Sequence, residues 1–297
     1  MTKYKSEPVK FDGGAGTIAA DRWSPRSDGP TRGTVVMLHG GGQTRHSWDR
    51  AAKNLVAEGW DVYTLDARGH GDSAWDQDGD YAIDALGRDL EMVVDQIGKR
   101  AGHRVRPVLF GASMGGLTSI LTEGGNPGFA RALVLVDITP KVEPQGIKRI
   151  RDFMRSAPDG FANLEEVADA VAAYQPHRPR PKNIEGLRKN VRERADGRLY
   201  WHWDPAFTRL GANLDNPHGI HQLAFSAASH ITAPTLLVHG AKSDIVGNEG
   251  IQELLDLIPQ SRAVSVAAAG HMVAGDDNAV FVDVVGEFLG ALTDGTP

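Results

Sequence analysis

The sequence predicts an α/β protein with a mostly parallel central sheet flanked by helices. Short β-branched and aliphatic runs alternate with segments whose apolar residues recur at spacings of three and four, which is typical of parallel strands joined by helices. The chain has 297 residues, 41% hydrophobic and 24% charged, which suits one large domain with a full core. A glycine-flanked serine between a predicted strand and a predicted helix is the third indication.

The first two strands are expected to form a hairpin. Segments 9–11 and 17–23 have strand character, and the glycine-rich segment 12–16 between them favours a turn. The aliphatic run 34–38 follows. An apolar run of this kind predicts a central strand that is buried on both faces of the sheet.

Helices and further strands then alternate. A helix is expected from about Trp48 to Gly59, because glycine commonly terminates helices. A longer amphipathic helix is expected where apolar residues recur from Ile83 to Ile97. The remaining predicted core strands are residues 61–65, 107–110, 132–136, 234–238 and 262–266, and a last helix lies around 280–289.

Residues 139–231 differ from the rest of the chain. They contain helical stretches without a clear buried strand, a loop rich in proline and arginine at 177–182, and the aromatic cluster 200–203. We therefore predict an α/β core made of residues 1–138 and 232–297, and a mainly helical cap made of residues 139–231. An insertion above a sheet commonly acts as a lid that shapes the pocket.

Composition excludes several classes of function. The formal net charge of −6 argues against nucleic acid as a partner. The chain has no cysteine, which excludes disulfides and thiolate catalysis. No apolar run approaches the roughly 18 residues of a membrane helix, and residues 1–8 do not resemble a secretory signal. We expect a cytoplasmic protein whose partner is a small molecule, not a membrane; the sequence leaves homo-oligomer formation open.

The strongest chemical signal is the segment Gly-Ala-Ser-Met-Gly-Gly at 111–116. It matches G-x-S-x-G between a strand and a helix, where a sharp turn lifts a nucleophile clear of the sheet. Side chains two residues away on either side of Ser113 would clash, so glycine is expected there. Ser113 is therefore the predicted nucleophile, and the alternative is an ordinary glycine-rich turn.

A second glycine-rich segment, His-Gly-Gly-Gly-Gln at 39–43, follows the predicted strand 34–38. Bare glycines let the backbone approach a substrate oxygen, and an oxyanion hole needs two N–H donors. We predict that these donors are Gly41 and Met114, with Gly42 as the near alternative to Gly41. The competing interpretation is a flexible turn.

A base and an acid follow later strands. His271 is the predicted general base, because a histidine in a loop at the carboxyl end of a strand can reach a serine on the same sheet edge. Asp244, in the segment 240–244, is predicted to accept the imidazole N–H and to stabilise the imidazolium. Asp137 competes for this role because it also follows a strand.

Together these motifs resemble the α/β-hydrolase superfamily over nearly the whole chain. The resemblance rests on His39-Gly40, the segment Asp-Ala-Arg-Gly-His-Gly-Asp-Ser at 66–73, the serine turn, residues 240–244 and Gly270-His271. The order serine, aspartate, histidine also agrees with that superfamily. The resemblance implies the α/β-hydrolase fold with a cap, and it is nearest to capped bacterial esterases, cofactor-free haloperoxidases, epoxide hydrolases and carbon–carbon hydrolases.

The predicted reaction is hydrolysis of a small or medium carboxylic ester or lactone through an acyl-enzyme on Ser113. The serine argues against epoxide hydrolysis, which uses an aspartate nucleophile in this superfamily. Two alternatives stay open: a carbon–carbon hydrolase acting on a vinylogous diketone, and a catalytically silent ligand receptor on the same fold.

No cofactor and no metal are predicted. The chain has no P-loop and no G-x-G-x-x-G after a strand, and the pair His218 and His221 lacks an accompanying glutamate motif. Trp201 and Trp203 are predicted to line the substrate pocket from the cap, together with Gly42, and ordinary packing is the alternative.

Overall fold

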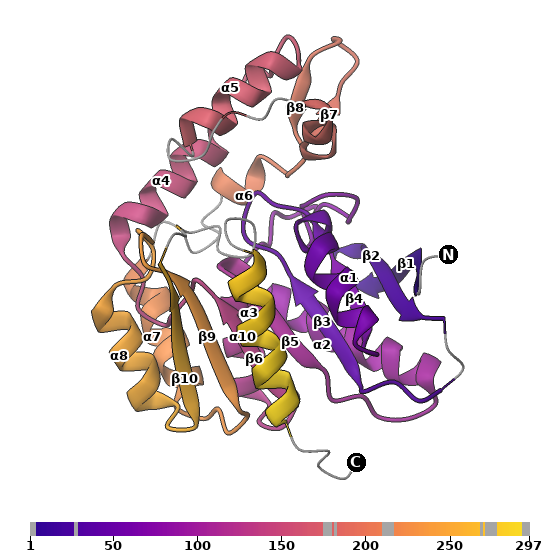
Figure 1. Ribbon diagram of the computed structural model, residues 1–297. Helices are drawn as coiled ribbons and strands as arrows, with labels where there is room; N and C mark the ends of the chain where they lie inside the picture. The colour runs from indigo at the N-terminus through magenta and orange to yellow at the C-terminus, as the bar shows by residue number, and fades with distance from the viewer. Residues whose placement is uncertain are drawn as a thin grey trace.

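The computed structural model describes residues 4–26, 29–174, 180, 183–209, 217–267, 270 and 278–292 (Figure 1). No helix within these ranges is long and apolar enough to cross a membrane.

An eight-stranded sheet in the order β1-β2-β4-β3-β5-β6-β9-β10 forms the centre of the molecule. Strands β1 (Tyr4–Gly13) and β2 (Gly16–Pro25) form the predicted hairpin, and β2 pairs antiparallel with β4 (Asp61–Leu65). All other pairings are parallel. The parallel strands besides β4 are β3 (Thr34–Leu38), β5 (Val108–Ala112), β6 (Ala132–Val136), β9 (Thr235–Gly240) and β10 (Ser261–Val266).

The parallel arrangement brings the predicted catalytic loops together. Every residue of β4 and β6 is buried, as expected for central strands that helices cover on both faces. Carboxyl ends of parallel strands meet at one edge of the sheet, where ligands bind in such folds. The loops after β3, β5, β6 and β9 all start at this edge.

Helices cover both faces of the sheet. Apolar side chains of α1 (Asp49–Ala57) and α10 (Asn278–Ala291) form one core cluster with one face. Those of α2 (Ile83–Ala101), α3 (Met114–Gly125), α7 (Pro217–Ala228) and α8 (Asn248–Leu257) form a cluster with the other. Before α1, the 3-10 helix η1 (Arg45–Trp48) continues the loop after β3.

A separate group of elements stands beyond the carboxyl edge of the sheet (Figure 1). They are α4 (Pro144–Met154), α5 (Leu164–Tyr174), the 3-10 helix η2 (Glu185–Asn190), β7 (Val191–Glu193), β8 (Leu199–Trp201) and α6 (Ala206–Arg209). These elements occupy the segment that we predicted as a mainly helical cap.

The structure differs from that prediction in two details. Strands β7 and β8 form an antiparallel pair within the segment, which the sequence pattern did not reveal because each has only three residues. The last helix of this segment, α7, packs against α3 of the core. We therefore propose that the cap consists of α4 to α6 and that α7 belongs to the core.

Candidate active site

Ser113 lies at a strained turn between β5 and α3. Its backbone angles are φ 48° and ψ −113°, a region that residues other than glycine rarely adopt. Its N–H donates to the carbonyl of Val136 on β6 at 3.2 Å, and its carbonyl accepts the N–H groups of Gly116 and Leu117 at 2.9 and 3.0 Å. The turn predicted from G-x-S-x-G is thus present, and neighbouring backbone holds it.

The glycines around Ser113 are required by close backbone approach. A Cβ atom on Gly111 would lie 2.5 Å from the carbonyl oxygen of Gly115. One on Gly115 would lie 2.4 Å from the carbonyl oxygen of Leu38, at the end of β3. Neither contact can be relieved by a side-chain movement, because the atoms in the way are backbone. This confirms the physical reason for which glycine was expected two residues from the serine.

The glycine-rich loop after β3 lies next to the serine. A Cβ on Gly40 would be 3.3 Å from the Cβ of Ser113, and Gly41 lines the same cavity as Ser113. The N–H of Gly42 is already used, because it donates to Nε2 of His70 at 3.2 Å. Among the described residues neither Gly41 nor Met114 has an acceptor for its N–H; the Met114 N–H is the first of helix α3 and has no partner within it. This favours Gly41 over Gly42 as an oxyanion donor.

Three buried histidines surround this loop. His39, His70 and His202 have exposed fractions of 1%, 0% and 1%, and the ring centroids of neighbouring members are 5.2 Å and 5.8 Å apart. His202 belongs to the cap segment, and its Nδ1 accepts the N–H of Gly71 at 2.8 Å. The sequence pattern did not reveal the contact between His70 and His202, because the two residues are distant along the chain.

Burial keeps all three imidazoles neutral. Loss of hydration lowers the pKa of His39 and of His70, the latter well below its usual value, and the neighbouring rings lower the pKa of His70 further. Burial also lowers the pKa of His202 to about 3, to which proximity of His39 contributes. Neutral imidazole offers one donor and one acceptor nitrogen, so each ring can connect two backbone groups.

The two candidate acids have different surroundings. Asp137 is fully buried at φ 51°, and its carboxylate accepts the N–H of Gly240 at 2.9 Å and the hydroxyl of Ser243 at 2.6 Å. Asp244 is part-exposed, and Arg149 of α4 contacts its carboxylate at 2.9 Å. Asp137 thus braces the loop that carries Asp244, while Asp244 itself is reached from the cap. His271 lies outside the described residues, and its role as general base stays a prediction.

The cavity at Ser113 is apolar and encloses about 50 Å³. It lies between the core and the cap, with Ile147, Ile150 and Met154 of α4 on the cap side. None of the described residues that line it carries a charged side chain; the others are Gly41, Tyr81, Ile83, Ser113, Met114, Leu117, Ile138, Val142, Phe207 and Ile220. Such a cavity suits a neutral, apolar group on the substrate.

The predicted aromatic pocket residues lie behind this lining. Trp201 and Trp203 are buried and stack on each other with centroids 4.9 Å apart. The indole N–H of Trp203 donates to the carbonyl of Met154 at 3.2 Å, and a Cβ on Gly42 would meet Met154 and the Trp203 ring at 3.5 Å. None of the three lines the cavity at Ser113, so their role in substrate binding stays a prediction.

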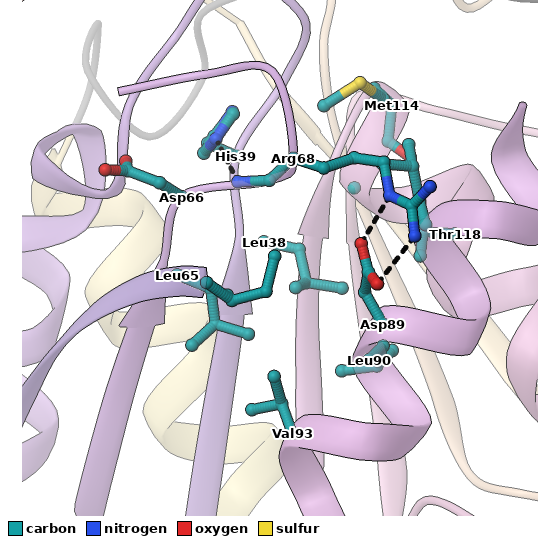
Figure 2. A pocket seen from close by; sticks show the side chains of 14 residues that line it. Leu38, His39, Leu65, Asp66, Arg68, Asp89, Leu90, Val93, Met114 and Thr118 are labelled. Carbon is teal, nitrogen blue, oxygen red and sulfur yellow. Dashed lines mark hydrogen bonds and ion pairs between the residues drawn. The ribbon is translucent and has the colours of Figure 1, made fainter. Parts of the chain in front are cut away.

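A second, smaller cavity of about 30 Å³ lies behind the nucleophile turn. Figure 2 shows Leu90 and Val93 below the ion pair between Arg68 and Asp89, and Leu38 and Leu65 to its left. The guanidinium contacts both carboxylate oxygens, at 2.6 and 2.7 Å. Met114 lines both this cavity and the one at Ser113.

Within the described residues one cluster has the residue types of a metal site: Asp21, His46 and Asp49. However, Nε of Arg45 lies 3.1 Å from the carboxylate of Asp21. That guanidinium already provides a positive charge at the cluster, and we assign the cluster no part in the chemistry.

Comparison with known proteins identifies the family of the chain. Residues 29–278 match the family described as serine aminopeptidase, S33. The chain belongs to this family of α/β-hydrolases. The superfamily and the fold predicted from the sequence are thereby confirmed, and the protein is an α/β-hydrolase enzyme.

Individual relatives cover most of the chain. Esterase Rv0045c of Mycobacterium tuberculosis is 29% identical over 281 residues, which cover 91% of this chain and 86% of that protein. Its crystal structure superposes with a TM-score of 0.71 at 27% identity, covering 97% of this chain and 92% of the other. The mouse sn-1-specific diacylglycerol lipase ABHD11 is 29% identical over 265 residues, 86% of this chain and 80% of the lipase. A Novosphingobium aromaticivorans α/β-hydrolase, 23% identical with a TM-score of 0.76, shares the fold over 98% of this chain and 99% of its own.

Proposed function

We propose that this enzyme hydrolyses small or medium carboxylic esters or lactones with Ser113 as nucleophile, His271 as general base and Asp244 as the acid that orients it. The observation that carries the proposal is the position of Ser113. Its strained backbone places it in the wall of an apolar cavity, where the glycine-rich loop also lies.

The proposed reaction has two steps. Oγ of Ser113 attacks the carbonyl carbon while His271 takes the hydroxyl proton, and the N–H groups of Gly41 and Met114 stabilise the oxyanion. The tetrahedral intermediate collapses, and the alcohol leaves with the proton from His271. Water, deprotonated by His271, then attacks the acyl-enzyme, so the carboxylic acid is released and Ser113 regains its proton. No cofactor enters this scheme.

The cavity supports the choice of substrate. The described part of the lining has no charged side chain, which favours a neutral acyl group, because a carboxylate buried against these residues would lose its hydration without compensation. The relatives described as an esterase and a diacylglycerol lipase cleave ester bonds according to their names, which supports an ester or a lactone as the substrate of this enzyme.

The test compares p-nitrophenyl acetate and butyrate turnover by the wild type and by Ser113→Ala. We expect the substitution to lower kcat by about 10⁴-fold or more. A matched control is Ser119→Ala, six positions along the same segment, where the hydroxyl donates only to the carbonyl of Gly115 at 2.8 Å. This control should keep most of the activity.

Other outcomes point to the alternatives. Equal rates in wild type and Ser113→Ala would refute the assignment of the nucleophile. Cleavage of a coloured dienol diketone without ester turnover would identify a carbon–carbon hydrolase. Saturable binding of a ligand without turnover would identify a silent receptor.

A further inference from the structure

The glycine-rich loop 39–43, here called the oxyanion loop because it carries the proposed donor Gly41, is held from the side of the core by two histidine rings. Nδ1 of His39 lies 2.8 Å from the carbonyl oxygen of Gly40, and its Nε2 accepts the N–H of Ala67 at 3.0 Å. Nε2 of His70 accepts the N–H of Gly42 at 3.2 Å. The two rings therefore hold the backbone immediately before and immediately after Gly41.

Because the peptide unit is planar, these contacts determine the direction in which the N–H of Gly41 points. The carbonyl of Gly40 and the N–H of Gly41 belong to one trans peptide unit and point in opposite directions. The N–H of Gly42 belongs to the next unit. When both units are held, the angles φ and ψ of Gly41 are held as well, although glycine on its own can adopt almost any backbone conformation.

The ring of His70 can accept the N–H of Gly42 at Nε2 only in one protonation state. Its Nδ1 lies 3.2 Å from the carbonyl of Arg68, so the hydrogen is on Nδ1 and Nε2 is free to accept. Burial and the nearby rings of His39 and His202 favour this neutral form. Phe207 packs edge-on against His70 with centroids 4.8 Å apart, which fixes the ring plane.

We propose that His70 is a positioning residue of the oxyanion hole: by accepting the N–H of Gly42 it holds the loop so that the N–H of Gly41 meets the oxyanion formed at Ser113. This inference rests on the proposed function. His70 is fully buried and is not among the described residues that line the cavity at Ser113, so the proposed role is one of positioning. It acts through the glycine loop.

Residues of the cap in turn hold the backbone around His70 through hydrogen bonds. His202 accepts the N–H of Gly71, the residue that follows His70, and the N–H of Asp204 donates to the carbonyl of Gly69, the residue before it, at 2.8 Å. The backbone on both sides of His70 is thus fastened to the cap segment 202–204. Seating of the cap and the position of the oxyanion loop are connected through His70.

The experiment compares His70→Leu with His70→Gln. Leucine removes the acceptor for the Gly42 N–H, whereas the glutamine side chain can place its carbonyl oxygen close to the position of Nε2. His221→Gln serves as the matched control, because this part-buried histidine pairs with Glu253 at 3.0 Å, between α7 and α8. For each protein kcat and KM are measured with p-nitrophenyl acetate, together with the urea midpoint of unfolding.

We expect His70→Leu to lower kcat by about 10-fold to 100-fold with KM changed less than about threefold, because oxyanion contacts act on the transition state. For His70→Gln we expect a kcat at or above the geometric mean of the wild-type and His70→Leu values. The control His221→Gln should keep the wild-type kcat. A merely structural role predicts instead that kcat follows the urea midpoint in both His70 variants. Equal kcat in wild type and folded His70→Leu, or no recovery in folded His70→Gln, would overturn the proposal.

A second readout separates this inference from the proposed function. Labelling of Ser113 by a fluorophosphonate, followed by mass spectrometry, needs no ester turnover but places a phosphoryl oxygen in the same hole. If the wild type labels without hydrolysing esters, the proposed substrate class is wrong, and the labelling rates of the His70 variants still decide the inference. If the wild type does neither, both proposals fall.

Discussion

Nη2 of Arg149, on the cap helix α4, lies 2.9 Å from both carboxylate oxygens of Asp244. The predicted triad acid is therefore contacted by a cap cation. Both side chains are more than 30% exposed, 43% and 33%, so this ion pair contributes little to stability. Its importance lies in its place, since it connects the cap to the loop that is expected to orient His271.

For the acid, we expect Asp244→Asn to lower kcat by about 10³-fold or more, because the amide no longer stabilises the imidazolium. Arg149→Met should keep kcat within about tenfold, since the carboxylate remains. Steady-state kinetics on p-nitrophenyl acetate measures the kcat of both variants.

Asp137→Asn is the informative comparison. We expect this variant to have a lower urea midpoint of unfolding, because the carboxylate of Asp137 accepts the N–H of Gly240 and the hydroxyl of Ser243. A folded Asp137→Asn variant that loses more activity than Asp244→Asn would reverse the assignment.

The buried pair of Arg68 and Asp89 should be important for stability. Its side chains are only 4% and 7% exposed, and Asp89 also accepts the N–H of Gly14 at 2.7 Å, which connects helix α2 to the first hairpin. Arg68→Met leaves a buried carboxylate without its partner, and we expect a loss of about 3–5 kcal/mol in the free energy of unfolding.

Urea titration followed by circular dichroism measures this loss. The double variant Arg68→Met with Asp89→Leu should be more stable than Arg68→Met alone, since it removes the unpaired charge. If the two variants are equally stable, the cost does not come from the buried carboxylate.

The stability of the enzyme should fall in mild acid. In the unfolded chain His202 titrates near its usual pKa of 6.5, whereas burial lowers its pKa in the folded protein to about 3. Between these values the unfolded state binds more protons, so stability is complete above 6.5 and is lost as the pH falls toward 3. The lowered pKa values of His39 and His70 act in the same direction.

Urea midpoints at pH 7.5, 6 and 4.5 test this, with His202→Asn as the comparison. Asparagine can accept the N–H of Gly71 in place of Nδ1 but does not titrate. The stability difference between wild type and variant should therefore shrink as the pH falls. A difference that is constant over the whole range would show that His202 is not the titrating group.

Met114 should limit the length of the acyl chain. Its side chain lines both cavities, and a flexible methionine fills such gaps well. Met114→Ala should join the two spaces, so the preference in kcat/KM should move from acetate and butyrate toward hexanoate and octanoate, by about tenfold in the octanoate-to-acetate ratio. The isosteric Met114→Leu is the control. A ratio that does not change in the alanine variant would show that the second cavity is inaccessible to substrate.

Much of the fold could be predicted because it depends on local signals. Apolar runs gave the parallel strands, and the strand–turn–helix context of Ser113 gave the nucleophile turn. The hairpin of β7 and β8 could not be found, because strands of three residues carry no usable period. The packing of α7 on α3 was equally hidden, since the helical pattern of a core helix and of a cap helix is the same.

The sequence by itself determined the superfamily and the turn at Ser113, because the G-x-S-x-G pattern and its strand–turn–helix context are local signals. The structure adds that Gly111 is restricted by Gly115, which is close in the chain, whereas Gly115 is restricted by Leu38, which is distant in the chain.

Only the tertiary structure decided that the N–H of Gly42 already has an acceptor in His70. It also decided that Asp137 holds the loop before Asp244, that Arg149 of the cap contacts Asp244, and which side chains enclose the cavity. The histidine cluster shows the reason most clearly. His39, His70 and His202 are far apart in the chain, and their neutral state arises from burial against one another, which no local pattern records.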